Sequence, residues 1–201
     1  MTTSAAFKQF GQNGESIAGK SRCIQLDAQL NPYDRATTIS VADGHLFVEG
    51  GVGVGGAVTL LYGLDQQCAN KPMDLHLKKL KLDRFRIDFD LLDLPLAGAV
   101  VVWSPSGISS IPICVEGITP GVGFSCDMLF SDFAGEADFD HIQYIAIVLN
   151  SAGAIFSHGY GIRSIRAVLD PDAPAGQHPW SLPEPAFVKP LTKPALTQRG
   201  R

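Results

Sequence analysis

The segment that decides the fold reads Arg84-Phe85-Arg86-Ile87-Asp88-Phe89-Asp90. Its three apolar residues stand at every second position, and charged residues fill the positions between them. In a β-strand this period of two directs all three apolar side chains to one face, whereas in a helix they would not form a single stripe. The segment therefore predicts a strand with one face in a hydrophobic core and the other in solvent.

Nine further segments carry strand signals of the same kind. They are residues 22–26, 37–41, 45–49, 57–62, 99–103, 108–115, 122–129, 142–149 and 162–169. Turn signals such as Asp43-Gly44 and residues 104–107 separate them. Many short strands joined by Gly- and Pro-rich turns predict an antiparallel sandwich or barrel. Short helical turns are expected only within residues 131–140 and within the first thirty residues.

The composition is that of one folded domain. The chain has 201 residues, of which 45% are hydrophobic and 18% charged. A chain of this size buries ~70% of its unfolded surface, which is enough for a core without a metal or disulfide staple. The net charge of −4 argues against a nucleic-acid-binding protein, which needs a basic surface. No apolar run approaches the ~18 residues of a membrane-spanning helix.

The sequence divides into three parts. We expect residues 1–20 to form an N-terminal arm, residues 21–169 the β-sandwich domain, and residues 170–201 an extended C-terminal arm. Seven of the thirteen prolines lie in the last part, and proline continues neither a helix nor a β-ladder.

The C-terminal arm is too apolar for a free linker. Its candidate partner-binding residues are Trp180, Phe187 and Leu191. After Glu184 it holds basic residues and no acidic ones, whereas residues 1–169 carry more acidic than basic side chains. A basic arm beside an acidic body is consistent with docking onto a neighbour, and a solvated tail end is the alternative.

The N-terminal segment lacks the charged start and continuous apolar stretch of a secretory signal. We therefore expect a cytoplasmic or particle-associated protein. A secreted or cell-surface protein supplied already cut is the alternative.

The four cysteines, Cys23, Cys68, Cys114 and Cys126, form no C-x-x-C motif. Cys114 and Cys126 flank a predicted turn at Thr119-Pro120-Gly121, where a hairpin would bring them near each other. They either form a disulfide or remain half-buried thiols that act as small hydrophobic residues, and the second interpretation is preferred.

One segment matches a nucleotide-binding motif. Gly14-Glu15-Ser16-Ile17-Ala18-Gly19-Lys20-Ser21 fits G-x-x-x-x-G-K-[ST], in which Gly14, Gly19, Lys20 and Ser21 would cradle phosphates. That loop must follow a buried strand and open a long helix, and the flanking sequence predicts neither. We expect a glycine-rich entry into the first strand, with the phosphate loop as an alternative.

The candidate ligand-binding residues lie in three places. They are Gly51, Gly53, Gly55, Arg84, Arg86 and Trp103. The glycines belong to a loop that could gate a binding surface, although a mobile connection between strands is the simpler interpretation. The two arginines project from the outer face of their strand. The tryptophan ends a strand beside a turn, where packing under the turn is favoured over lining a rim.

We predict no metal, no cofactor and no catalytic residue. None of the five histidines stands in H-x-H, H-x-D or H-x-E spacing, so the local halves of common iron and cupin sites are absent. No G-x-S-x-G elbow occurs. Asp88, Asp90 and Asp93 could gather calcium, but their alternation with Arg84 and Arg86 makes cross-strand ion pairing the simpler interpretation.

Three segments carry a family resemblance. Asp132-Phe133-Ala134-Gly135, residues 137–147 and residues 161–168 resemble the β-jelly-roll domains of bacterial secreted proteins with PEP-CTERM sorting tags. In those domains a D-F-x-G and D-F-x-x-I-x-x-I stretch leads into a strand. The resemblance implies a jelly roll and supplies no catalytic residue. Residues 187–198 lack the apolar anchor of such a tag.

These observations favour a non-catalytic binding module, not an enzyme, that recognises a peptide, another protein or a glycan on a sheet face or edge. The main alternative is a structural protein of a virion, filament or cell-surface layer, whose arms clamp neighbours and which self-associates through the C-terminal arm. A nucleotide-binding enzyme is the third hypothesis.

Overall fold

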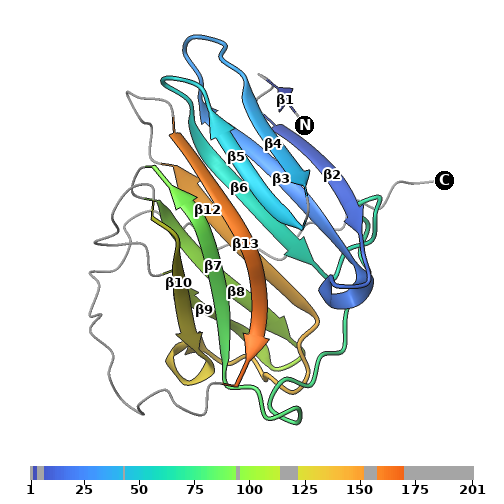
Figure 1. The fold of residues 1–201 in the computed structure, drawn as a ribbon. Helices are drawn as coiled ribbons and strands as arrows, with labels where there is room; N and C mark the ends of the chain where they lie inside the picture. Colours follow the sequence, from blue (N-terminus) through green and yellow to red (C-terminus); the bar gives the residue numbers. More distant parts are fainter. Residues whose placement is uncertain are drawn as a thin grey trace, which may run out of the picture. The chain divides into compact units, whose positions relative to one another are not determined.

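Two antiparallel sheets make up the part of the chain that the computed structural model describes, which is residues 2–3, 7–42, 44–93, 96–113, 122–151 and 158–169. The front sheet has the strand order β1 (Thr2–Thr3), β4 (Thr37–Ala42), β5 (His45–Gly50), β13 (His158–Val168), β7 (Arg84–Leu92) and β10 (Phe124–Leu129). The back sheet has the order β11 (Ala134–Gly135), β9 (Gly107–Pro112), β8 (Ala97–Ser104), β12 (Tyr144–Ser151), β6 (Gly55–Tyr62), β3 (Ser21–Leu30) and β2 (Phe7–Asn13). Figure 1 shows the two sheets as stacked layers.

The chain passes repeatedly from one sheet to the other. It passes to the other sheet after β1, β3, β5, β6, β7, β9, β10 and β12. The connections β2–β3, β4–β5, β8–β9 and β11–β12 stay within a sheet, and the first three join paired neighbours. This confirms the predicted antiparallel β-sandwich of jelly-roll type. The described residues hold only two helical turns, η1 (Ala18–Lys20) and η2 (Phe130–Asp132). No helix in this part of the chain could span a membrane.

All ten predicted strands are present, but the N-terminal boundary was wrong. Residues 1–20 are not an arm ahead of the sandwich, because β1 pairs with β4 and β2 pairs with β3 along seven residues. The segment Phe7–Asn13 has no apolar alternation because β2 lies at the edge of its sheet and is largely exposed. The predicted C-terminal arm, residues 170–201, lies outside the described residues.

The core lies between the inner faces of the two sheets. Phe85, Ile87 and Phe89 are buried there, as their alternation predicted. At one end of the core the Phe85 ring contacts the rings of Phe130 and Phe133, with centroids 5.0 and 6.0 Å away. Aromatic pairs in this range add stability beyond the area they bury.

Disulfides reinforce the sandwich, contrary to the preferred interpretation of the cysteines. Cys23 on β3 bonds to Cys68 in the β6–β7 connection, with their Cα atoms 5.2 Å apart. Cys126 is fully buried and is also disulfide-bonded. Cys114, its predicted neighbour, lies outside the described residues. Spacing did not predict the Cys23–Cys68 bond because 45 residues separate the two.

A substitution in β7 tests the assignment of its inner face to the core. We expect Ile87→Ala to lower the free energy of unfolding by about 3 kcal/mol, because Ile87 is fully buried and truncation leaves a cavity. Ile108→Ala is the matched control, since the Ile108 side chain is 46% exposed, and it should cost less than about 1 kcal/mol. Urea unfolding measures both. Equal losses would contradict the assignment of Ile87 to the inner face.

Candidate functional site

Ion pairs cover the outer face of the front sheet. Asp88 on β7 accepts hydrogen bonds from Ser125 Oγ (2.6 Å), from Arg166 Nη2 (2.6 Å) and from the hydroxyl of Ser164. Asp90 accepts from Arg163 Nε (2.6 Å), and His45 Nδ1 lies 2.6 Å from its other oxygen. The carboxylates of β7 therefore pair with side chains of the neighbouring strands β10 and β13 and of β5, the next strand beyond β13, which is the cross-strand pairing preferred over a calcium site.

A register shift between β7 and β13 creates this arrangement. Ile162 pairs with Phe89 and Ser164 with Asp88, so the register skips Arg163. On β7 the register skips Asp90, because Gly161 pairs with Leu91 and the next residue, Ile162, pairs with Phe89. The two skipped residues form an ion pair with each other. An extra residue in one strand exchanges the faces of all residues after it.

The shift decides what each face of β13 carries. Before it, Tyr160 and Ile162 point into the core. After it, Ile165 and Ala167 pack against the core, while Arg166 points outward to Asp88. If β13 alternated regularly through Arg163, with no bulge, Ser164 and Arg166 would enter the core.

A cleft opens beside the second half of β13. β5 pairs with β13 only as far as Ile162, whereas β13 continues along β7 to Val168. In the described residues no strand pairs with Arg163–Val168 on the β5 side. The cleft found there, which we call the β13 cleft, has a volume of about 600 Å³. Ligand pockets commonly fall between 300 and 1,000 Å³.

The floor of the β13 cleft is the apolar interior itself. Its apolar lining includes Leu75, Leu77, Phe85, Ile145, Ile147 and Ile165. These residues come from both sheets and from the β6–β7 connection. A ligand in the cleft would therefore meet core side chains at its base.

The rim of the β13 cleft is polar and positively charged. Arg22 on β3 donates from Nε to Gln12 Oε1 (2.8 Å) and from Nη1 to Tyr62 Oη (3.2 Å). Arg163 and Arg166 stand on the opposite wall. The residues that line the cleft include these three arginines and no aspartate or glutamate. Asp90 and Asp88 form ion pairs with Arg163 and Arg166. Among the described residues no carboxylate pairs with Arg22, so its positive charge is the one available to a ligand.

The comparisons with known proteins do not assign the chain to a family. No protein-family model and no curated protein matches it. Among solved structures it is similar to the family 11 carbohydrate-binding module from Clostridium thermocellum in complex with a β-1,3-1,4-mixed-linked tetrasaccharide, with a TM-score of 0.44, 13% identity, and coverage of 81% of this chain and 88% of that chain. A variant of a family 29 carbohydrate-binding module matches with a TM-score of 0.36, 15% identity, and coverage of 80% and 90%. TM-scores this low carry no argument about what the chain binds.

The structure places the predicted arginines away from the cleft. Arg84 is buried and donates to Asp83 from Nε (2.8 Å) and from Nη2 (2.9 Å). Hydrogen bonding to Asp83 raises the Arg84 pKa, although burial opposes the rise. Arg86 forms two hydrogen bonds of 2.6 Å with Asp127 on β10. Arg86 therefore joins β7 to β10, and Arg84 Nη1 reaches the same Asp127 at 3.4 Å.

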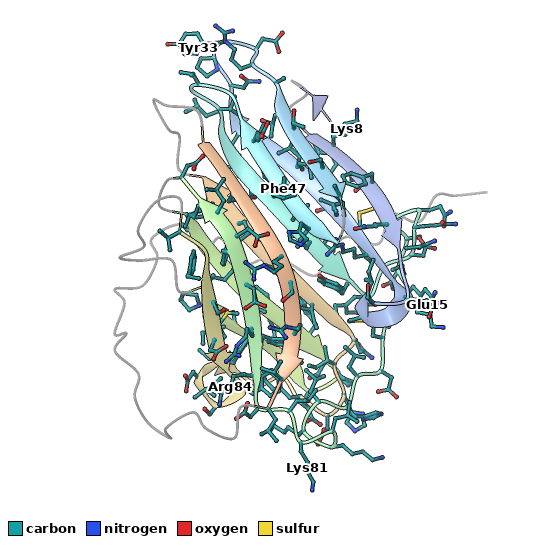
Figure 2. All side chains as sticks on the ribbon, in the orientation of Figure 1. Lys8, Glu15, Tyr33, Phe47, Lys81 and Arg84 are labelled. Carbon is teal, nitrogen blue, oxygen red and sulfur yellow. A yellow bond between two sulfur atoms is a disulfide. The ribbon has the colours of Figure 1, made fainter. Side chains whose placement is uncertain are left out.

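The predicted glycine loop packs against its neighbour. The Gly51 N–H donates to the Ala36 carbonyl, and Gly53 has a φ of +78° with its backbone against the Tyr33 ring. Gly55 begins β6. Figure 2 shows Tyr33 at the end of the sandwich opposite Arg84. The β13 cleft lies toward the Arg84 end, because residues 163–168 pair with that half of β7.

Trp103 does not line a rim. It is buried on β8 in a small cluster with Val101 and Ala146, apart from the main core. Packing was the favoured interpretation, and the structure confirms it. Its Nε1 atom has no hydrogen-bond partner among the described residues.

The structure contradicts the phosphate-loop alternative. The segment from Gly14 to Ser21 joins β2 to β3, and its single 3₁₀ turn leads directly into β3 instead of a long helix. The Ser21 hydroxyl is buried and donates to the Leu64 carbonyl (2.7 Å), so it cannot reach a metal-bound phosphate. Lys20 Nζ lies 3.5 Å from the Glu15 carboxylate.

Sequence reasoning missed the cleft residues Arg22, Arg163 and Arg166. One signal was present in the sequence. Ile162 and Ile165 are three positions apart, so a single strand can bury both only with an extra residue between them. Arg22 carried no such signal, because its neighbours across the cleft come from distant parts of the chain. The predicted arm residues Trp180, Phe187 and Leu191 lie outside the described residues.

Asp88 allows a test of the network through pH. Burial raises its pKa, but hydrogen bonds from Ser125, Ser164 and Arg166 outweigh burial and hold the pKa below the ordinary 3.8. A lowered pKa means that the carboxylate stabilises the fold above about pH 4, and that this stability is lost as the pH falls through the lowered pKa.

We therefore expect Asp88→Asn to lower the free energy of unfolding by about 1–3 kcal/mol at pH 7. The difference from the unaltered protein should shrink as the pH falls from about 4 through the lowered pKa, because the folded protein then also binds a proton at Asp88 and loses the stabilising charge. Asp34→Asn, at an exposed loop position whose positive φ suits asparagine, is the control. Urea unfolding at several pH values measures the difference, and a loss independent of pH would contradict the network.

Proposed function

We propose that the protein is a non-catalytic binding module that takes an acidic carbohydrate in the β13 cleft. The observation that carries the proposal is the combination of an apolar floor with a rim on which Arg22 is bonded only to the neutral side chains of Gln12 and Tyr62, while Asp90 and Asp88 bind Arg163 and Arg166.

The shape and lining of the cleft suit a sugar. A pyranose ring presents C–H groups on its faces and hydroxyls around its edge. The apolar floor matches the ring faces, and the rim offers planar hydrogen-bonding groups from Gln12, Asn13 and Arg22. Pockets of this kind bind through apolar area and gain specificity from a few placed polar groups.

Charge favours a sugar that carries a carboxylate. Arg22 uses two of its N–H groups on Gln12 and Tyr62, and a guanidinium has five donors in a planar fork. The remaining donors are held in place by these two bonds, so little side-chain entropy is lost when they bind. Arginine with carboxylate is among the stronger charge-assisted pairs.

The same lining supports binding without catalysis. Glycoside hydrolysis generally uses two carboxyl groups on either side of the scissile bond. The residues that line the β13 cleft supply none.

A second candidate function rests on the edge of β13 that no strand among the described residues pairs with. An extended peptide could add as a strand along residues 163–168, where β5 no longer pairs. Such binding depends on main-chain hydrogen bonds, so it should survive the loss of the Arg22 side chain.

A glycan and peptide array followed by calorimetry tests the proposal. We expect uronic-acid oligosaccharides to bind and their neutral counterparts to bind at least tenfold more weakly, with affinity that falls as salt is raised. Arg22→Gln should weaken uronate binding at least tenfold. Arg35→Gln, at an exposed loop position beside Gly51, is the control and should bind as the unaltered protein does.

Three other outcomes of the array and calorimetry would change the proposal. Equal affinity for acidic and neutral sugars would contradict the role of Arg22. Binding of peptides alone, unchanged by Arg22→Gln, would support the edge-strand candidate. An array with no binder would overturn the proposed function.

A further inference from the structure

The β6–β7 connection and the segment before β12 bring two histidines and an aspartate together outside the β13 cleft. They are Asp74, His76 and His141, and their ligand atoms all lie within 4.8 Å of one another. His76 Nε2 is 3.3 Å from Asp74 Oδ2, and His141 Nδ1 is 3.6 Å from Asp74 Oδ1. The two imidazole rings meet edge to face, with centroids 5.0 Å apart.

Paired backbone holds the cluster together. Leu75 and Ile142 form an antiparallel bridge, in which each N–H donates to the other carbonyl at 3.1 Å. Extended residues alternate in direction, so Asp74 and His76, on either side of Leu75, share one face. His141 precedes Ile142 and lies opposite His76 in the same register. Ile142 is fully buried in the core, which anchors the bridge.

The contacts within the cluster are not hydrogen bonds. Among the described residues no hydrogen bond joins Asp74 to either imidazole, and the distances of 3.3 and 3.6 Å exceed the usual 2.7–3.2 Å for N–H···O. A tetrahedral metal with ligands at about 2.0–2.1 Å separates its ligand atoms by about 3.3 Å. The two distances to Asp74 are close to this separation, and all three ligand atoms lie within 4.8 Å of one another, so small side-chain rotations would bring them around one ion.

We propose that Asp74, His76 and His141 bind a divalent transition metal ion, with Zn²⁺ as the ion that suits them. Imidazole nitrogen selects zinc, copper, nickel and iron over calcium and magnesium. The side chains of Asp74, His76 and His141 are 73%, 34% and 56% exposed, so an ion can enter and water can fill the remaining coordination positions.

The metal site would also support the β13 cleft. Leu75, between the two ligands Asp74 and His76, lines the floor of the cleft together with Leu77. An ion shared with His141 would tie the β6–β7 connection to the segment before β12. This site does not depend on the function proposed for the cleft.

Zinc titration of the full-length protein tests the proposal, by calorimetry and by thermal unfolding in a buffer that does not chelate metals. We expect one zinc ion to bind and the melting temperature to rise with zinc concentration, since a ligand that binds only the folded state stabilises it. Co²⁺ should give the visible absorption of a protein-bound ion. His76→Gln and His141→Gln should each weaken zinc binding at least tenfold.

His45→Gln is the matched control, because His45 contacts Asp90 on the front sheet and not the cluster. It should bind zinc as the unaltered protein does. The proposal is overturned if the unaltered protein does not bind zinc, or if His76→Gln and His141→Gln bind it as His45→Gln does. A thermal shift with Ca²⁺ and none with Zn²⁺ would also overturn it.

Discussion

The register shift between β7 and β13 is the constraint on which the functional side of this sandwich depends. A regular ladder would turn Ser164 and Arg166 inward and Ile165 and Ala167 outward. Burying an arginine without a partner costs several kcal/mol, whereas a bulge costs one lost pairing. The extra residues Asp90 and Arg163 then pair with each other on the outer face, so the interruption leaves no charge unpaired at this point.

The cleft follows from the length of β5, which begins at His45 and so covers only the first half of β13. β5 pairs with β13 up to Ile162 and no further, and the β4–β5 hairpin ends where β13 begins its second half. The back sheet continues beneath this gap through β6 and β12, which supply Tyr62, Ile145 and Ile147. The front sheet is open beside β13, and the back sheet continues beneath it. The cleft therefore has an apolar floor, and its walls are formed before any ligand binds.

Rigid support surrounds the cleft and the histidine cluster. The Cys23–Cys68 bond ties β3, which carries Arg22, to the β6–β7 connection, which carries Leu75. The bridge between Leu75 and Ile142 joins that connection to the segment before β12. A site that is held in position before binding loses less entropy when a ligand arrives, so the loops matter here as much as the strands.

Ten of the strands, the antiparallel class and the inner face of β7 could be read from the sequence alone, whereas β1, β2 and β11 could not. Alternation in residues 84–90 is a local property, because successive side chains of a strand always point to opposite faces. Only the tertiary structure decided the cleft, the Cys23–Cys68 bond and the cluster of Asp74, His76 and His141. Their members are far apart along the chain, and no spacing rule relates residues that meet only when two sheets pack. Arg84 and Trp103 were candidate binding residues because their residue types are typical of binding surfaces. Both are buried in the folded protein, because neighbouring side chains pack around them.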